Sequence, residues 1–549
     1  MSTSAAGSPS TRVGAAGGGA FSRSASGLIR VAGSWDVFIY NVGLVSVGIA
    51  IAFNQYFGPS LYPGAMVWLS TLLAALGMVA AASTFYFWSI IFPRSGGVYV
   101  SLSRSTTSSL AFVFSVVESM ILLYYGALAA SLVVKVGLAS FFATVGGVAH
   151  SSTLLEWATS VSTKTGVFWI GTGILLAAGL LLVSGTRRYF TVQKVLFVVA
   201  VLGMLVVTLV LLFGSRSSFK ANLHHVTGLS YAGVIASAKK SGFVTAPSSF
   251  WESVKFMIWP LLPLLGAIQS VGIGGEIKRV SRNQLIGMLG AVIATGALIA
   301  LFAILSAKAF GNDFQGAIAF NSLGGFTHAS TEGTIGATPY FTVLAGILTN
   351  SVVLSVIVMT TFVAWIWFWI PAEIAYTTRS MIAWSFDRLA PDRLGYVSKR
   401  FNTPVVAIGV STATAILFMW AIAFKNINLL TLIEPLLVIW GAAMLVAVVF
   451  PWTGRRFFDS SPASAYRIGR LPLMSLMGAL TVAFFGLAIV LLWKDKIAAG
   501  PLIAHHLPTE FWILVSTLAF AVLWYVGNRI YRKREGVDIA LAFNEIPIE

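Results

Sequence analysis

PLLPLLGAIQSVGIGGEIK, residues 260–278, interrupts an apolar run that is otherwise long enough to cross a membrane. It combines two prolines, four glycines and a glutamine within 19 residues. Proline removes a helical hydrogen bond and glycine weakens a helix interior, so the combination predicts a break in the helix. In hydrocarbon, irregular backbone is tolerated only where it is buried in protein or lines a cavity. The stretch therefore predicts a ligand site at membrane depth.

The composition places the rest of the chain in the same environment. Of the 549 residues, 57% are hydrophobic and only 10% are charged, against about 25% charged in soluble proteins. The net charge is +17, and the charges fall in short clusters between apolar runs, which suits a membrane surface better than a nucleic-acid partner. The absence of cysteine excludes disulfides, thiolate nucleophiles and cysteine-based zinc sites. We expect an all-α integral membrane protein.

A helix needs roughly 20 apolar residues to cross a bilayer. The hydropathy pattern predicts twelve such spans, which are 35–57, 63–92, 108–138, 166–184, 190–214, 254–276, 284–309, 338–376, 403–423, 428–450, 473–493 and 508–529. Most lysines and arginines lie in the tails and in every second connection. By the positive-inside rule both termini are then cytoplasmic, in a multi-pass protein of the plasma membrane. Residues 1–30, rich in Ser, Gly and Ala, are expected to be a disordered cytoplasmic tail, and 531–549 a second tail.

A second cluster of helix breakers lies in span one, in YNVGLVSVGIA at 40–50. Spans one and six are five helices apart, which is the arrangement of a five-plus-five inverted repeat with its binding site at two broken helices. The pattern predicts a ten-helix core over 31–452, followed by two accessory helices over 453–530. Within the core, 35–214 would form the first repeat and 254–450 the second. The alternative is that the small residues only let helices approach closely.

The two breaks define the predicted substrate site. The free N–H groups and carbonyls of half-helix ends suit the carboxylate and the ammonium of a zwitterion. The candidate substrate-binding residues are Gly43, Ser46, Val47, Gly48, Gly266, Gln269, Ser270 and Gly272.

Three segments resemble the amino acid permeases of the amino acid–polyamine–organocation (APC) superfamily. They are FPRSGGVYVSLSR at 92–104, GAIQSVGIGGEIKRVSRN at 266–283 and TRSMIAWSFDRLAPDRLGYVSKRFNTPVVA at 378–407. The resemblance implies a leucine-transporter-like core, alternating access and a small amino acid as substrate. It also implies that Tyr99 helps to close an inner gate. The stretch 92–104 has no Lys-Ser/Thr after its glycines, so we interpret it as a cytoplasmic hinge and not as a phosphate loop.

Ionisable side chains inside a span are functional candidates. Glu118 lies well inside span three, on one helical face with Tyr125, where it can pair with a substrate cation, carry a proton or simply hold helices together. Thr360 and Thr361 lie in span eight, where hydroxyls bind sodium in sodium-coupled relatives of the implied fold, although back-bonding within the helix is the ordinary use of threonine. Glu373, near the inner end of span eight, is interpreted as structural or as snorkelling toward the membrane surface.

The resulting hypothesis is a secondary active transporter of amino acids, embedded in the lipid bilayer, without a cofactor or metal, and coupled to H⁺ or Na⁺. A transporter or exchanger of polyamines or other organic cations is the alternative. A membrane-embedded enzyme is disfavoured because the spans contain no metal-ligand spacing and no Ser/His/Asp set. The oligomeric state stays open.

Overall fold

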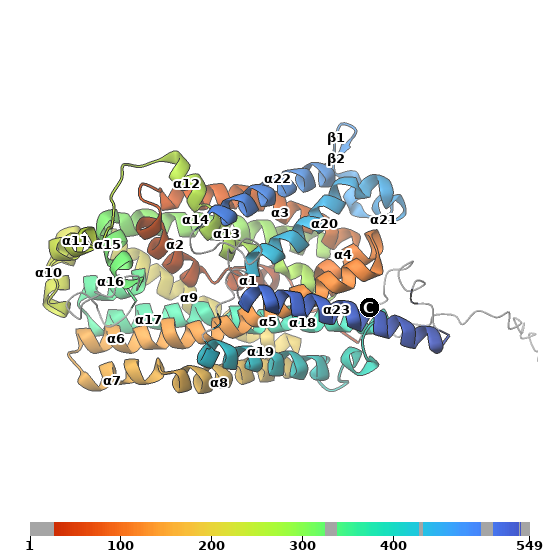
Figure 1. The fold of residues 1–549 in the computed structure, drawn as a ribbon, viewed down its shortest axis with the longest axis horizontal. Helices are drawn as coiled ribbons and strands as arrows, with labels where there is room; N and C mark the ends of the chain where they lie inside the picture. Colours follow the sequence, from red (N-terminus) through yellow and green to blue (C-terminus); the bar gives the residue numbers. More distant parts are fainter. Residues whose placement is uncertain are drawn as a thin grey trace, which may run out of the picture.

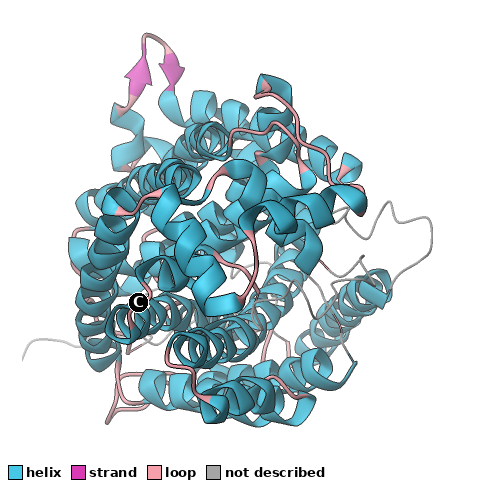
Figure 2. Cartoon of the chain, turned by 90° about the vertical axis from the view of Figure 1, so that its left-hand side faces the viewer, coloured by secondary structure: helices cyan, strands magenta, loops and turns pink. Residues whose placement is uncertain are grey.

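The computed structural model describes residues 27–323, 338–425, 427, 432–495, 509–536 and 539. Its helices run mostly along the longest axis of the molecule (Figure 1). Viewed from one end, many of them are seen nearly along their own axes (Figure 2). Within the described residues, twelve helices are long and apolar enough to cross a membrane, as the hydropathy pattern predicts.

These twelve spans consist of the following helices, some of them in two or three pieces: α1 (Ser34–Val45) and α2 (Val47–Leu61); α3 (Val67–Ile91); α5 (Ser108–Leu132), η1 (Val133–Leu138) and α6 (Ala139–Val148); α8 (Lys164–Val183); α9 (Thr186–Phe213); α12 (Phe250–Phe256), α13 (Ile258–Leu264) and η2 (Leu265–Gly272); α14 (Val280–Phe310); α17 (Val352–Trp367) and α18 (Trp369–Phe386); α19 (Val405–Lys425); α20 (Ile433–Thr453); α22 (Leu473–Lys494); and α23 (Thr509–Arg534).

Shorter elements connect the spans. They are α4 (Gly97–Ser105), α7 (Ser152–Val161), α10 (Arg216–Thr227), α11 (Tyr231–Lys240), η3 (Gly274–Glu276), α15 (Asn312–Ser322), α16 (Phe341–Thr349), η4 (Asp392–Gly395), α21 (Arg455–Asp459), η6 (Pro462–Ala465), β1 (Arg467–Ile468) and β2 (Leu471–Pro472). The two strands pair antiparallel as a small hairpin. Helices α10, α11 and α15 gather at one end of the bundle, and α4, α21 and the hairpin lie toward the other (Figure 1).

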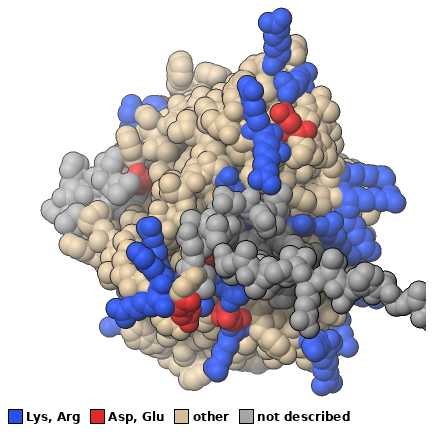
Figure 3. Space-filling view, turned by 90° about the vertical axis from the view of Figure 1, so that its right-hand side faces the viewer, with Lys and Arg blue, Asp and Glu red and all other residues tan. Residues whose placement is uncertain are grey.

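We call this second end the basic end. Lysine and arginine side chains surround it, with few acids among them (Figure 3). The exposed basic residues of α21, the hairpin and the end of α23 are Arg455, Arg456, Arg467, Arg470, Arg529, Lys533 and Arg534.

The predicted limits of span eight, 338–376, are wrong at both ends. The structure has a separate helix α16 and a span that runs from Val352 to Phe386. Asn350 ends α16 in a left-handed conformation with φ 46°, and the hydroxyl of Ser351 caps α17. At the other end, polar residues continue the helix because they are buried against protein instead of lipid.

Other limits also differ from the prediction. Span three continues beyond residue 138 to Val148, through the π-helical segment η1. Of the predicted N-terminal tail, residues 1–26 lie outside the described part of the chain. Of the predicted C-terminal tail, 531–534 belong to α23, and 540–549 lie outside the described part.

Candidate functional site

The helix of span one is interrupted at Ser46, between α1 and α2. Ser46 has φ 48°, in the left-handed region that residues with a side chain rarely adopt. Its N–H donates to the carbonyl of Gly43 at 2.9 Å, and its hydroxyl donates to the carbonyl of Trp365 at 3.1 Å. The interruption is therefore held against the end of α17.

Span six changes from an α-helix to a 3-10 helix where it lies beside the interruption of span one. Its last eight residues form the 3-10 helix η2, and runs longer than three or four residues are uncommon for this helix. Gly266 touches the backbone of span one here. A β-carbon at this position would lie 2.4 Å from the carbonyl carbon of Leu44 and 2.7 Å from the nitrogen of Val45. Only glycine lets the two spans approach so closely.

Hydrogen bonds also join spans one and six, one helical turn beyond Gly266. Asn41 donates from Nδ2 to Ser270 Oγ and accepts from the backbone N–H of Ser270, both at 3.0 Å. Ser270 in turn donates to Gln284 Oε1 of α14 at 2.6 Å. Spans one, six and seven are thus connected by buried side chains, and each polar atom in this set meets a complementary partner.

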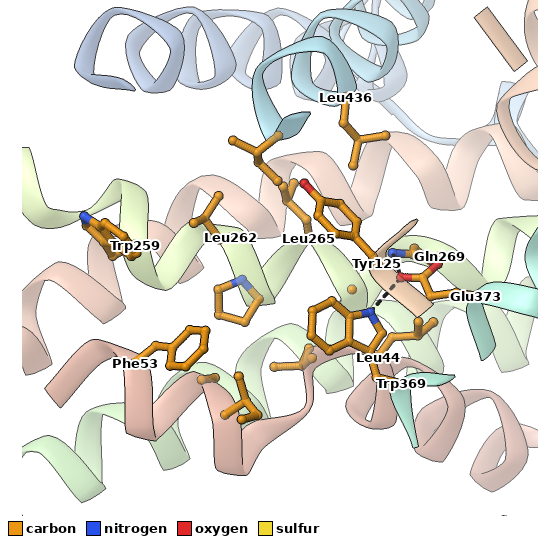
Figure 4. Close-up of a pocket in the computed structure, with 16 residues that line it drawn as sticks. Leu44, Phe53, Tyr125, Trp259, Leu262, Leu265, Gln269, Trp369, Glu373 and Leu436 are labelled. Atoms are coloured by element: carbon orange, nitrogen blue, oxygen red, sulfur yellow. Dashed lines mark hydrogen bonds between the residues drawn. The ribbon is translucent and has the colours of Figure 1, made fainter. Parts of the chain in front are cut away.

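A cavity lies beside the contact between spans one and six (Figure 4). Its volume is about 720 Å³, including the part open to the outside. Its lining comes from spans one, three, six, eight and ten and consists of Leu44, Val45, Ile49, Ala50, Phe53, Tyr125, Trp259, Leu262, Pro263, Leu265, Gly266, Gln269, Trp369, Glu373, Ile433 and Leu436. Most of this surface is apolar.

The polar groups of the cavity gather at one end. Figure 4 shows Glu373, Gln269 and Trp369 side by side there. Glu373 Oε1 accepts a hydrogen bond from Trp369 Nε1 at 2.8 Å and a longer one from Gln269 Nε2 at 3.4 Å. Glu373 is fully buried, yet its Oε2 and the Oε1 of Gln269 have no hydrogen-bond partner among the described residues. Two acceptors are therefore available to a ligand.

The other end of the cavity is aromatic. Trp259 and Phe53 lie there, with Leu262 between them and the polar end (Figure 4). Trp259 stacks on Phe57 with ring centroids 4.2 Å apart, and its indole nitrogen donates to Asp495 at 3.3 Å. This end can hold an apolar group of a ligand, and its lining residues carry no ionisable side chain.

Three of the predicted site residues line the cavity, namely Gly266, Gln269 and Tyr125. Ser46 and Ser270 bond other helices, as described above. The remaining glycines face large aromatic side chains: a β-carbon on Gly43 would lie 2.8 Å from Phe368, and one on Gly272 would lie 2.3 Å from Tyr376. Gly48 faces Trp365 in the same way, at 3.0 Å, and Val47 lines a separate groove between α9 and α14. These positions match the alternative interpretation, in which small residues allow close approach.

The predicted coupling residues lie outside the cavity, except for Tyr125. Glu118 Oε1 accepts from the Tyr376 hydroxyl and from Trp440 Nε1, both at 2.7 Å, while Oε2 has no partner among the described residues. Thr360 is exposed on the outer face of α17. Thr361 donates to the carbonyl of Ile357 at 2.8 Å and faces Gly203 of α9.

The turn before α4 closes the bundle toward the basic end. The N–H of Gly96 donates to the carbonyl of Gly272 at 3.0 Å, and the N–H of Gly275 donates to Ser95 Oγ at 3.2 Å. Gly96 has φ 122° and Gly97 has φ 58°. A β-carbon on Gly97 would lie 2.1 Å from the Tyr376 hydroxyl, so glycine is needed for both the turn and the contact.

Two buried ion pairs reinforce this closure. Arg104 Nη1 lies 2.6 Å from Asp387 Oδ2, and Arg379 Nε lies 2.6 Å from Glu276 Oε1. Burial by itself would lower the pKa of the Arg104 guanidinium, but the Asp387 carboxylate outweighs it and the pKa is raised. Tyr99, predicted to be a gate residue, donates its hydroxyl to the same carboxylate at 2.8 Å. Burial raises the pKa of the Tyr99 hydroxyl well above its usual range, so it stays a donor.

Sequence reasoning missed Glu373 and Trp369. Glu373 carries the general signal of an ionisable residue inside an apolar run. Because the predicted span eight ends at residue 376, Glu373 is expected near the membrane surface, as a structural or snorkelling residue. In the structure ten more residues follow before the helix ends at Phe386, and Glu373 lies at the cavity.

Within the described residues, no group of three or more His, Asp and Glu side chains is arranged to hold a metal ion. No protein-family model matches the chain, and no curated protein is significantly similar to it.

Proposed function

We propose that the protein is a secondary active transporter that moves small amino-group-bearing solutes, amino acids in the first instance, across the plasma membrane by alternating access. The observation that supports this proposal is the cavity between the interruptions of spans one and six. A buried site at irregular backbone in two spans is the arrangement of transporters with inverted repeats. Residues 35–214 and 254–450 would be the two repeats, as in the leucine-transporter-like fold.

Alternating access needs a closure that can open. The turn at Gly96–Gly97, the end of span six and the two buried ion pairs supply a candidate for it, because all of them join segments distant in the sequence. By the positive-inside rule the basic end would face the cytoplasm, with both termini there. The structure would then represent a state closed toward the cytoplasm.

Coupling to H⁺ or to Na⁺ is part of the proposal, without any cofactor or chemical conversion of the solute. The environment favours the proton. Glu118 and Glu373 are buried carboxylates with neutral donors only among the described residues, and buried acids in membranes often carry protons. Thr360 and Thr361, the candidates for a sodium site, face away from the cavity.

The test is uptake into proteoliposomes that contain the purified full chain. A panel of labelled amino acids and amines is presented with an inward proton gradient, an inward sodium gradient or no gradient. We expect saturable uptake of at least one solute, stimulated by the proton gradient. If no solute on the panel is taken up or exchanged under any gradient, the transporter proposal is wrong.

A pair of variants ties uptake to the cavity. Ala50 lines it and is almost fully buried, so Ala50→Trp should fill it and abolish uptake. Leu417 is 69% exposed on the outer surface of α19, so Leu417→Trp should leave uptake near the wild-type rate. Equal uptake by both variants would place the transport path elsewhere.

A further inference from the structure

We propose that Glu373 is the counter-ion of a protonated amine, and that the solute bound in the cavity is a monoamine with an apolar body and no carboxylate. The inference rests on the proposed transport through this cavity, and among its amino-group-bearing solutes it favours amines in place of amino acids. It follows from three features of the lining: where its acceptors are, which charges it lacks, and how its apolar part is placed.

The acceptors suit an ammonium group. Glu373 Oε2 and Gln269 Oε1 are both buried and both without a partner among the described residues. An ammonium has three donors and no acceptor, so it can donate to acceptors of this kind and neutralise the carboxylate. Trp369 is a positioning residue, since its indole nitrogen holds the other carboxylate oxygen at 2.8 Å.

A solute carboxylate finds no cationic partner in the same lining. The lining residues include no lysine, arginine or histidine. The backbone at Val47 and Gly48, where the sequence predicted carboxylate binding, is not among them either. A buried carboxylate without a partner is strongly disfavoured, and it would also lie close to the like charge of Glu373. A zwitterion therefore fits less well than an amine.

The number of acids in the cavity lining also limits how many amino groups the solute can carry. Glu373 is the single acid of the lining, and the surface opposite to it is formed by Phe53, Trp259 and Leu262. A second ammonium, as in a diamine or polyamine, would enter this apolar end without a counter-ion. An aromatic or aliphatic group would instead bury its surface there.

A matched set of probes tests the inference on the wild-type full chain in detergent micelles, by isothermal titration calorimetry. Phenethylamine, phenylalanine and 3-phenylpropanoate share one ring and differ in their charged groups, and 1,6-diaminohexane adds a second amine. We expect phenethylamine to bind at least about tenfold more tightly than each of the others.

Variants then assign the effect to one residue. Glu373→Gln should weaken phenethylamine binding by about thirtyfold or more, as expected when a buried charge pair loses one partner. Glu373→Asp keeps the charge and should keep the preference for the amine over phenylalanine. Glu434→Gln is the matched control: Glu434 is also buried and also accepts from an indole, that of Trp493 at 2.6 Å, but does not line the cavity. It should bind phenethylamine like the wild type.

The outcomes separate the two proposals. Tighter binding of phenylalanine or of 3-phenylpropanoate, or an equal loss in Glu434→Gln, would overturn the inference and leave the transporter proposal intact. Absence of binding by all four probes would also overturn it, while the uptake panel judges the transporter proposal independently. If Glu373→Gln does not fold, the comparison of probes on the wild type still decides the class of solute.

Discussion

Four buried acids among the described residues form two groups with different partners. At the closure near the basic end, Glu276 pairs with Arg379 and Asp387 pairs with Arg104. Glu373 at the cavity and Glu118 outside it accept only from neutral donors among the described residues. A buried charge is costly unless it is paired. Each acid at the closure is neutralised by an arginine. Glu118 and Glu373, in contrast, each have one carboxylate oxygen without a hydrogen-bond partner among the described residues.

Helix α18 contributes residues both to the cavity and to the closure near the basic end. Along α18 and the residue that caps it, Glu373 faces the cavity, Tyr376 bonds Glu118, and Arg379 and Asp387 belong to the ion pairs. From 373 to 387 the helix rises by about 21 Å at 1.5 Å per residue. A single helix therefore contributes both to the lining of the cavity and to the closure. The comparison teaches that partners, and not burial alone, separate structural acids from candidate functional ones.

The largest effect is expected from breaking an ion pair. Arg379→Met leaves the Glu276 carboxylate buried without its partner, which should lower the free energy of unfolding by about 3–5 kcal/mol. The measurement is denaturant unfolding of the purified protein in mixed micelles. The double variant Arg379→Met with Glu276→Leu removes both charges and should recover most of the loss. A single variant as stable as the wild type would contradict the distinction between the two groups.

A smaller loss is expected when the closure keeps its charges but loses one donor. Tyr99→Phe removes the hydroxyl that donates to Asp387 at 2.8 Å. A hydrogen bond to a charged group contributes about 1.5–3 kcal/mol. The free energy of unfolding, measured under the same conditions, should therefore fall by that amount. Tyr86→Phe is a suitable control, because its hydroxyl meets only the neutral Tyr466 hydroxyl, at 3.3 Å.

Glu118→Gln should change stability little, by about 0.5–1.5 kcal/mol at most, since its amide oxygen can accept the same two hydrogen bonds. If Glu118 carries the coupling proton, uptake driven by a proton gradient should nevertheless fall strongly. Stability and uptake are measured on the same preparation. A stability loss as large as that of Arg379→Met would place Glu118 with the structural acids.

The smallest effect belongs to an ion pair at the surface. Lys194 Nζ lies 2.8 Å from Asp36 Oδ1, and the lysine side chain is 50% exposed while that of Asp36 is 10% exposed. The Asp36 carboxylate keeps a hydrogen bond from the N–H of Gly33 at 2.8 Å when the lysine is replaced. Exposed pairs contribute about 0–1 kcal/mol, so Lys194→Met should unfold nearly like the wild type. The small effect should fade further at high salt. If Lys194→Met lowers the free energy of unfolding as much as the loss of a buried pair does, the N–O distance, and not burial, would determine how much an ion pair stabilises this protein.

Sequence reasoning located the region of the candidate site but assigned its residues only in part. Gly266 and Gln269 were predicted from the cluster of helix breakers, and both line the cavity. The glycines at 43, 48 and 272 belong to the same clusters, yet they face aromatic rings. A cluster of small residues indicates close contact, and which of them faces a ligand depends on the rotation of each helix.

The sequence by itself determined the twelve helices that are long and apolar enough to cross a membrane in the described part of the chain, because the length and hydropathy of a span are local properties of about 20 consecutive residues. Only the tertiary structure decided which acid meets the cavity. Glu118 and Glu373 both lie in apolar spans, and their roles differ through neighbours that come from distant segments: Trp440 and Tyr376 for one, Gln269 for the other. A one-dimensional pattern shows that a charge will be buried, whereas its partners are set by how the helices meet in space.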